Sequence, residues 1–160
     1  MTAMDESQTE ALARLLQTQE IGALGTLHDG EPFVSMVPYA VLPRAGFVIH
    51  VSGLAAHTKD MLVSSAVSLL VVAAADPGTS AQARARVTIQ GAAKQCTDSD
   101  ARYAEAKSAY LSRFPHAAEL FTFADFSLFV IEPRSARFIG GFAQATSLGA
   151  ETLLRIVSGA

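Results

Sequence analysis

The chain has 160 residues, half of them hydrophobic and 17% charged, with a net charge of −3 at pH 7, and this length suits a single domain over residues 1–160. The absence of a basic run argues against nucleic acid and an anionic membrane surface as partners, and no apolar stretch reaches the ~20 residues that span a bilayer. Cys96 is the only cysteine, and the acidic N-terminus is unlike a secretory signal, so we expect a reducing, cytoplasmic location.

The N-terminal half alternates short apolar runs with turn signals. Ser7–Glu10 has the form of a capping box, which predicts a helix start. Asp29-Gly30 is a strong hairpin signal, and Pro38 indicates a sheet edge or a bulge. The elements expected in this half are a helix over residues 6–18, strands over 21–27, 33–41 and 47–52, and a helix over 55–64.

The C-terminal half continues with strands and two helices. Residues 66–74 are almost all apolar, as in a strand buried on both faces, whereas residues 84–90 alternate polar with apolar side chains. Gly91 suits a bulge, and Pro133 separates two final strands. The elements expected here are strands over 66–74, 84–90, 126–132 and 137–142, a helix that begins at 97–100 and ends near 115, and a tail helix over about 147–158.

These elements predict a mainly β, α+β fold. Six or seven strands joined mostly by tight turns must run antiparallel to their neighbours. No glycine-rich dinucleotide fingerprint follows the first strand, which argues against a doubly wound parallel sheet.

The first candidate binding site is the triplet His57, Thr58 and Lys59. The strand that ends near Ser52 leads into a helix whose first turn contains this triplet. Unpaired N–H groups and the helix dipole attract a phosphate, and a hydroxyl and an ammonium group add to that attraction. The alternative is an ordinary capped helix with a solvated lysine.

The second candidate is the half-polar strand over 84–90. Arg84 and Arg86 point the same way, and either guanidinium suits a phosphate. Gln90 on the same face suits the edge of a flat heteroaromatic ring, and Ser35 on the second strand is a further donor toward this space. The alternative is a strand that simply faces solvent.

Catalytic residues and metal ligands are not evident. The four histidines and the lone cysteine lack metal-ligand spacing, so we expect no metal site. No nucleophile elbow is present, and no side chain stands out as a general acid or base. Asp125 is an isolated acid among phenylalanines, for which a turn or cap role is the simpler explanation.

Several of these segments occur together in a known superfamily. The segments Val37–Ala40, Phe47–Ser52, Leu54–Met61 and Arg86–Gly91, in this order, resemble the pyridoxamine 5'-phosphate oxidase-like FMN-binding split barrel. The ending, Phe123–Pro133 and then Arg137–Ala145, is similar to the haem-utilisation branch of that superfamily. The resemblance covers about residues 10–146.

The resemblance implies an antiparallel split β-barrel with flanking helices, assembled as a homodimer with FMN at the interface. The low charged fraction is consistent with a dimer, although an alanine-rich composition also explains it. The implied cofactor-binding residues are His57, Thr58, Lys59 and Arg84 or Arg86 for the phosphate, Ser35, Met36, Val37 and Gln90 for the isoalloxazine ring, His50 and Ser52 at the neighbouring strand end, and Arg137 from the partner subunit.

The function expected from this resemblance is that of an FMN-binding oxidoreductase with an unassigned substrate. The flavin would supply the redox chemistry. Vitamin B6 oxidation is not expected, because the chain has no tryptophan and no matching substrate-binding ending. The alternatives are a haem-binding or haem-degrading protein of the same fold, and a non-catalytic dimeric module that binds or senses flavin. Haem-degrading members use a C-terminal histidine as iron ligand, whereas the last histidine here is His116.

Overall fold

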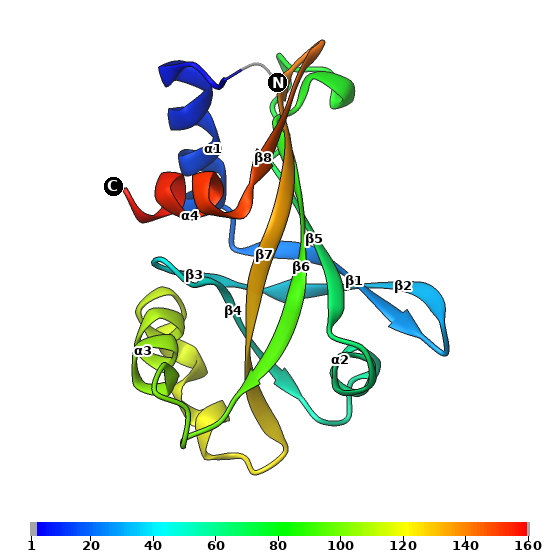
Figure 1. Cartoon of the computed structure of the whole chain (residues 1–160), viewed down its shortest axis with the longest axis vertical. Helices are drawn as coiled ribbons and strands as arrows, with labels where there is room; N and C mark the ends of the chain where they lie inside the picture. Colours follow the sequence, from blue (N-terminus) through cyan, green and yellow to red (C-terminus); the bar gives the residue numbers. More distant parts are fainter. Residues whose placement is uncertain (1–2, 160) are drawn as a thin grey trace.

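The computed structural model describes residues 3–159 and contains one antiparallel sheet with helices around it (Figure 1). The strand order is β2-β1-β5-β6-β7-β4-β3, with β8 added to β7, so the sheet has two ends and is not closed. The elements are α1 (Glu6–Thr18), β1 (Ile21–His28), β2 (Glu31–Pro38), β3 (Ala40–Leu42), β4 (Gly46–Ser52), α2 (Ala56–Val63), β5 (Ala66–Val72), β6 (Arg86–Cys96), α3 (Tyr103–Arg113), β7 (Phe126–Gly141), β8 (Gln144–Gly149) and α4 (Ala150–Ser158), with 3-10 helices η1 (Ala81–Ala83) and η2 (Pro115–Thr122).

Helix α1 has the predicted bounds but a different cap. Asp5 is the N-cap: its carboxylate accepts from the Gln8 N–H at 2.8 Å, and the Gln8 side chain accepts from the Asp5 N–H at 3.2 Å. The capping box predicted at Ser7–Glu10 is therefore wrong, because aspartate caps a helix as well as serine does.

The β1–β2 hairpin forms where it was predicted. Asp29 and Gly30 both have positive φ angles, of 51° and 82°, as a two-residue hairpin turn of this type requires. Strand β2 lies at a sheet edge, in agreement with Pro38. The strand predicted over 33–41 is in fact β2 and β3, separated at Tyr39, whose hydroxyl donates to the Leu16 carbonyl at 2.8 Å.

The long β6–β7 pair runs along the longest axis of the molecule (Figure 1). The predicted bulge at Gly91 is confirmed, and a Cβ there would lie 2.3 Å from the Glu132 carbonyl oxygen. Pro133 lies opposite this irregularity, where its missing N–H is tolerated. The prediction of two final strands broken at Pro133 is therefore wrong, and β8 was not predicted.

Two other predictions about elements need correction. Helix α3 begins at Tyr103, after a turn, and not at 97–100, and η2, which follows it, was not predicted. Strand β5 alternates buried and partly exposed residues, whereas β4 is buried on both faces over almost its whole length. The prediction that residues 66–74 form a strand buried on both faces is therefore wrong, because the outward residues of β5 lie on a face without a covering layer.

Burial divides the sheet into two faces. The first core lies on one side of the sheet, where α1, α2 and α4 pack against strand residues such as Leu69, Ile89 and Phe138. A second core lies between β4 and α3–η2. We call the opposite side of β2, β1, β5, residues 86–90 of β6 and residues 135–139 of β7 the outer face, where the intervening side chains are at least partly exposed. No helix of residues 3–159 is long and apolar enough to cross a membrane.

Candidate functional site

Two adjacent pockets open on the outer face and share Leu70. The first, which we call the apolar pocket, has a volume of about 540 Å³. The second, the arginine pocket, has a volume of about 620 Å³. The apolar pocket is lined by Gln19, Ile21, Gly22, Ala23, Val34, Ser35, Met36, Leu70, Val72, Ala73, Ala74 and Arg84, and the arginine pocket by Leu70, Arg86, Thr88, Gln90, Ser135, Ala136, Arg137, Ile139 and Ser147.

Arg84 and Arg86 are held by backbone carbonyls. The Arg84 guanidinium donates to the Ala73 carbonyl, with a distance of 3.0 Å from Nε. Arg86 Nη1 donates to the carbonyls of Gln82 and Arg84 at 3.0 and 3.1 Å. Neither forms an ion pair within residues 3–159. Their charges are therefore oriented by the chain and not neutralised by it.

The arginine pocket brings together three of the predicted site residues. Arg137 pairs in register with Thr88, two residues along β6 from Arg86, and Gln90 pairs with Ser135. Diagonal neighbours on paired strands lie ~7–8 Å apart, so the two guanidinium groups can reach one ligand. Arg137 Nη1 donates to the Ser147 hydroxyl at 3.1 Å. The predicted alternative, a half-polar strand that faces solvent, describes β6 only in part, because its polar face borders a pocket.

The predicted residues of β2 divide between the two faces. Met36 is 63% exposed on the outer face, whereas Val37 is buried in the core. The Ser35 hydroxyl lies 3.0 Å from His57 Nδ1, so this side chain is directed toward α2 and not toward Arg86. Burial lowers the pKa of His57, and the carboxylate of Asp60 partly opposes this effect.

The triplet at the start of α2 is engaged mainly within the fold. His57 contacts Ser35, and Thr58 is buried with a hydroxyl that has no partner in the described part of the chain. Lys59 is exposed. Of the three residues, Lys59 is thus the one that presents its polar group to solvent.

An ion-pair cluster beside this triplet was not predicted from the sequence. Asp60 is 5% exposed and accepts from Thr26 Oγ1 at 2.8 Å and from His28 Nδ1 at 2.7 Å. Burial raises the pKa of Asp60, but the hydrogen bonds from His28 and Thr26 outweigh it and hold the pKa below its ordinary value. No spacing signal connects His28 with a carboxylate 32 positions later.

His50 and Ser52 lie away from both pockets. His50 faces the second core, where its ring stacks on Phe121 at a centroid distance of 3.8 Å, and its Nδ1 has no partner in the described residues. Burial, together with the charge of Lys107, lowers the pKa of His50 to about 4. The Ser52 hydroxyl donates to the Asp125 carboxylate at 3.1 Å, which gives Asp125 the turn role suggested by the simpler interpretation.

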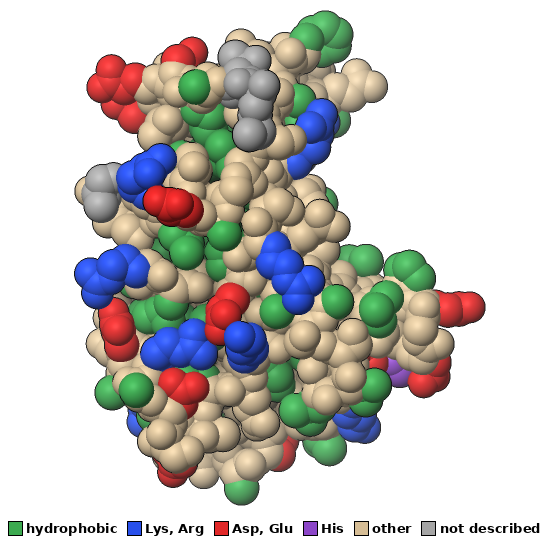
Figure 2. Space-filling view, in the orientation of Figure 1, with side chains coloured by type: hydrophobic (Ala, Val, Ile, Leu, Met, Phe, Trp, Pro, Cys, Tyr) green, Lys and Arg blue, Asp and Glu red, His purple; other side chains and the backbone are tan. Residues whose placement is uncertain are grey.

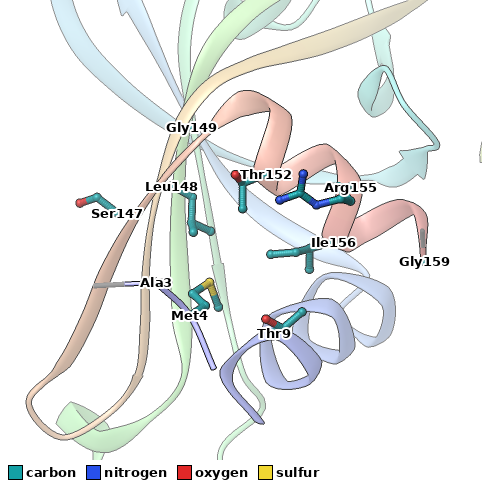
Figure 3. Close-up of a pocket in the computed structure, with 10 residues that line it drawn as sticks. All are labelled: Ala3, Met4, Thr9, Ser147, Leu148, Gly149, Thr152, Arg155, Ile156 and Gly159. Atoms are coloured by element: carbon teal, nitrogen blue, oxygen red, sulfur yellow. The ribbon is translucent and has the colours of Figure 1, made fainter. Parts of the chain in front are cut away.

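A further pocket, of about 630 Å³, lies between α1, α4 and β8 (Figure 3). Met4, Leu148 and Ile156 point into it, and Arg155 lies on its α4 side (Figure 3). None of the predicted site residues lines this pocket. Among residues 3–159, no three His, Cys, Asp or Glu side chains gather in a way that would hold a metal ion.

Comparison with known proteins identifies the family. Residues 8–140 match the pyridoxamine 5'-phosphate oxidase family, and the chain belongs to it. The solved structure of a heme binding protein from Mycobacterium smegmatis has the same fold, with a TM-score of 0.84 and 27% identity over 95% of this chain and 62% of that one. The fold is thus the antiparallel α+β split barrel that the sequence predicted.

Two curated relatives have names that refer to haem. The chain is 35% identical over 152 residues to "Non-canonical heme oxygenase HOZ, chloroplastic" of Arabidopsis thaliana, which covers 88% of this chain and 45% of the relative. It is 26% identical over 130 residues to "Heme oxygenase HutZ" of Vibrio cholerae, with 81% and 73% of the two chains covered. The chain therefore spans less than half the length of the plant relative.

Proposed function

We propose that this protein binds haem on the outer face of its sheet, with oxidative haem breakdown as the candidate activity. One observation carries the proposal: an apolar pocket and a pocket with two arginines adjoin at Leu70, and neither arginine is neutralised by a carboxylate of the described chain. Haem has the same division of chemistry, since its flat macrocycle is apolar and its two propionates are anionic. The names of the two curated relatives support this match.

The residues fit such a ligand in two ways. Val34 and Met36 are 67% and 63% exposed, and burial of this apolar surface against a macrocycle is favourable. Arg86 and Arg137 would hold the propionates through charge-assisted hydrogen bonds, and Ser147 already orients Arg137. Bound haem would supply the redox chemistry of its iron. None of the described histidines lines either pocket, so we assign no iron ligand to this chain.

We further propose that two copies associate through α2 and the β1–β2 hairpin, which we call the β1–β2 arm. Hydrophobic side chains gather over this arm in Figure 2, and Ile21, Leu62 and Val63 are 52%, 61% and 89% exposed. Exposed apolar surface of this extent marks an interaction site in soluble proteins. Because Ile21 also lines the apolar pocket, the second copy would border the ligand site.

Titration with hemin tests the proposal. The purified protein should give a stoichiometric Soret band, and the double variant R86Q/R137Q should bind hemin at least about 100-fold more weakly, since charge-assisted hydrogen bonds are worth ~1.5–3 kcal/mol each. R14Q is the matched control, because Arg14 is exposed on α1 and lines neither pocket. Loss of the Soret band with ascorbate and oxygen would indicate haem breakdown, and a stable band would leave a binding or sensing role.

Two results would contradict the proposal. One is hemin affinity that is the same in R86Q/R137Q and R14Q, which would place the ligand elsewhere. The other is tight, stoichiometric FMN together with no defined Soret band.

FMN is the second candidate ligand, in agreement with the family to which the chain belongs. The observation in its favour is that Arg84 and the backbone around Ser35 and Met36 border one pocket, so that a phosphate and a flat ring would both find partners. This interpretation predicts a yellow protein whose melting temperature rises when FMN is added.

A further inference from the structure

Helix α2 depends on polar contacts to stay on the sheet. It has eight residues, and its N-cap, Ala55, makes no side-chain capping bond. Helices of this length are not stable by themselves in water. Met61 is its one buried apolar side chain, while Leu62 and Val63 are exposed. The contacts of Asp60 and His57 with the β1–β2 arm therefore carry much of its attachment.

The central contact is the pair formed by His28 and Asp60. His28 Nδ1 lies 2.7 Å from Asp60 Oδ1, and the other carboxylate oxygen accepts from Thr26 at 2.8 Å. The carboxylate is almost fully buried, whereas the His28 side chain is 49% exposed. A proton can therefore reach His28 from solvent while Asp60 remains covered.

We propose that His28 is a pH-dependent latch, which in its protonated form holds α2 on the β1–β2 arm through Asp60 and releases the helix as the proton is lost. Neutral His28 can still donate a hydrogen bond, but the ionic attraction disappears. Because Ile21, Val34 and Met36 of the same arm line the apolar pocket, the latch would also change one wall of that pocket. That consequence rests on the proposed function, whereas the latch itself does not.

The surrounding charges support protonation of His28. The hydrogen bond and charge of Asp60 raise the pKa of His28, and Asp29 adds to this effect. A group with a raised pKa stabilises the folded contact fully below its ordinary pKa of ~6.5, and the contribution is lost as the pH rises through the higher value. Three charged or titratable groups lie near the pair: Asp29 of the turn, with Oδ2 3.8 Å from His28 Nε2, Glu31 of β2, opposite His28 in register, and His57 of α2. Lys59 of α2 is exposed. The cations of β6, which also packs against α2, are engaged elsewhere, since Arg86 donates to the carbonyls of Gln82 and Arg84 and Lys94 pairs with Glu132.

Hydrogen exchange of α2 as a function of pH tests the latch. After correction for the intrinsic pH dependence of exchange, opening of residues 56–63 should increase about fivefold between pH 6 and pH 9 in the wild type, as expected when one partly exposed ion pair is lost. H28F retains an aromatic ring beside Phe33 but cannot titrate, so its opening should be high and independent of pH. H116Q is the control, because His116 is an exposed histidine beside α3.

A second measurement does not depend on the folding of any variant. The ring resonances of His28 in the wild type should titrate with a pKa above 6.5. A pKa at or below that value, or the same pH dependence of exchange in wild type and H28F, would overturn the latch. Failure of hemin to bind would leave these exchange and titration results unchanged, so the two proposals fail separately.

Discussion

The two faces of the central sheet differ in what covers them, and adjacent residues on β5 show the difference. Leu69 is fully buried in the core that α1, α2 and α4 help to form, whereas Leu70 lines both outer-face pockets. One face has its apolar side chains covered by the chain itself. The other keeps apolar and cationic side chains open to solvent, and that is where a ligand or a second copy has most to gain.

The largest expected effect comes from this pair of leucines. Leu69→Ala should lower the free energy of unfolding by about 2–5 kcal/mol, because it leaves a cavity in a packed core. Leu70→Ala should lower it by less than about 1 kcal/mol but weaken hemin binding about five- to tenfold through lost apolar contact. Urea unfolding and hemin titration of both variants measure the contrast. Equal losses of stability in the two variants would mean that the outer face is covered.

The outline of this fold could be predicted because its signals are local. The Asp29-Gly30 turn, the alternation along residues 86–90 and the bulge at Gly91 each require only neighbouring residues, and each is confirmed. The strand predicted over 84–90 is wrong at its start, because Arg84 lies at the end of η1 and β6 begins at Arg86. The failures have tertiary causes. Pro133 ends no strand because it lies opposite the Gly91 irregularity on another strand. The sequence of β5 is apolar on both faces, but the strand is buried on one face only, because its outer face lacks a cover.

The candidate site was harder to predict for the same reason. Arg86, Gln90 and Arg137 of one chain meet in one pocket because β6 pairs with β7, whereas the resemblance to a family implied that Arg137 would come from a partner subunit. The contact between His28 and Asp60 depends on how α2 packs across β1, and the spacing of the two residues in the sequence does not indicate it. His50 has a residue type suited to cofactor binding, but its strand turns it toward Phe121.

A smaller effect on stability is expected from His50, the buried histidine of the second core, and its pH dependence is opposite to that of the half-exposed His28. Since the pKa of His50 lies near 4 in the fold and near 6.5 in the unfolded chain, the unfolded state binds more protons between these values. The wild type should therefore lose stability as the pH falls from about 6.5 toward 4. His50→Phe, which keeps a ring against Phe121, should remove about 2–3 kcal/mol of that loss.

Urea midpoints at pH 4.5 and pH 7.5 measure this prediction. The difference between the two midpoints should shrink in H50F but not in H116Q, whose histidine is exposed. An unchanged difference in H50F would mean that His50 is protonated within the fold, and that the second core is more open to water than its aromatic packing indicates.

Lys59→Ala should have the smallest effect on stability. It is also the most direct test of which face of the sheet binds the ligand. Lys59 is exposed on α2 and lines neither outer-face pocket, so unfolding should change by less than about 0.5 kcal/mol. Hemin affinity should stay within twofold of the wild type, as in the R14Q control. If FMN is instead the ligand and its phosphate reaches the start of α2, the same substitution should weaken FMN by about 10- to 100-fold. Calorimetric titration of K59A with each ligand therefore tells whether the cationic group at α2 or the arginines of the outer face hold the anionic end of the cofactor.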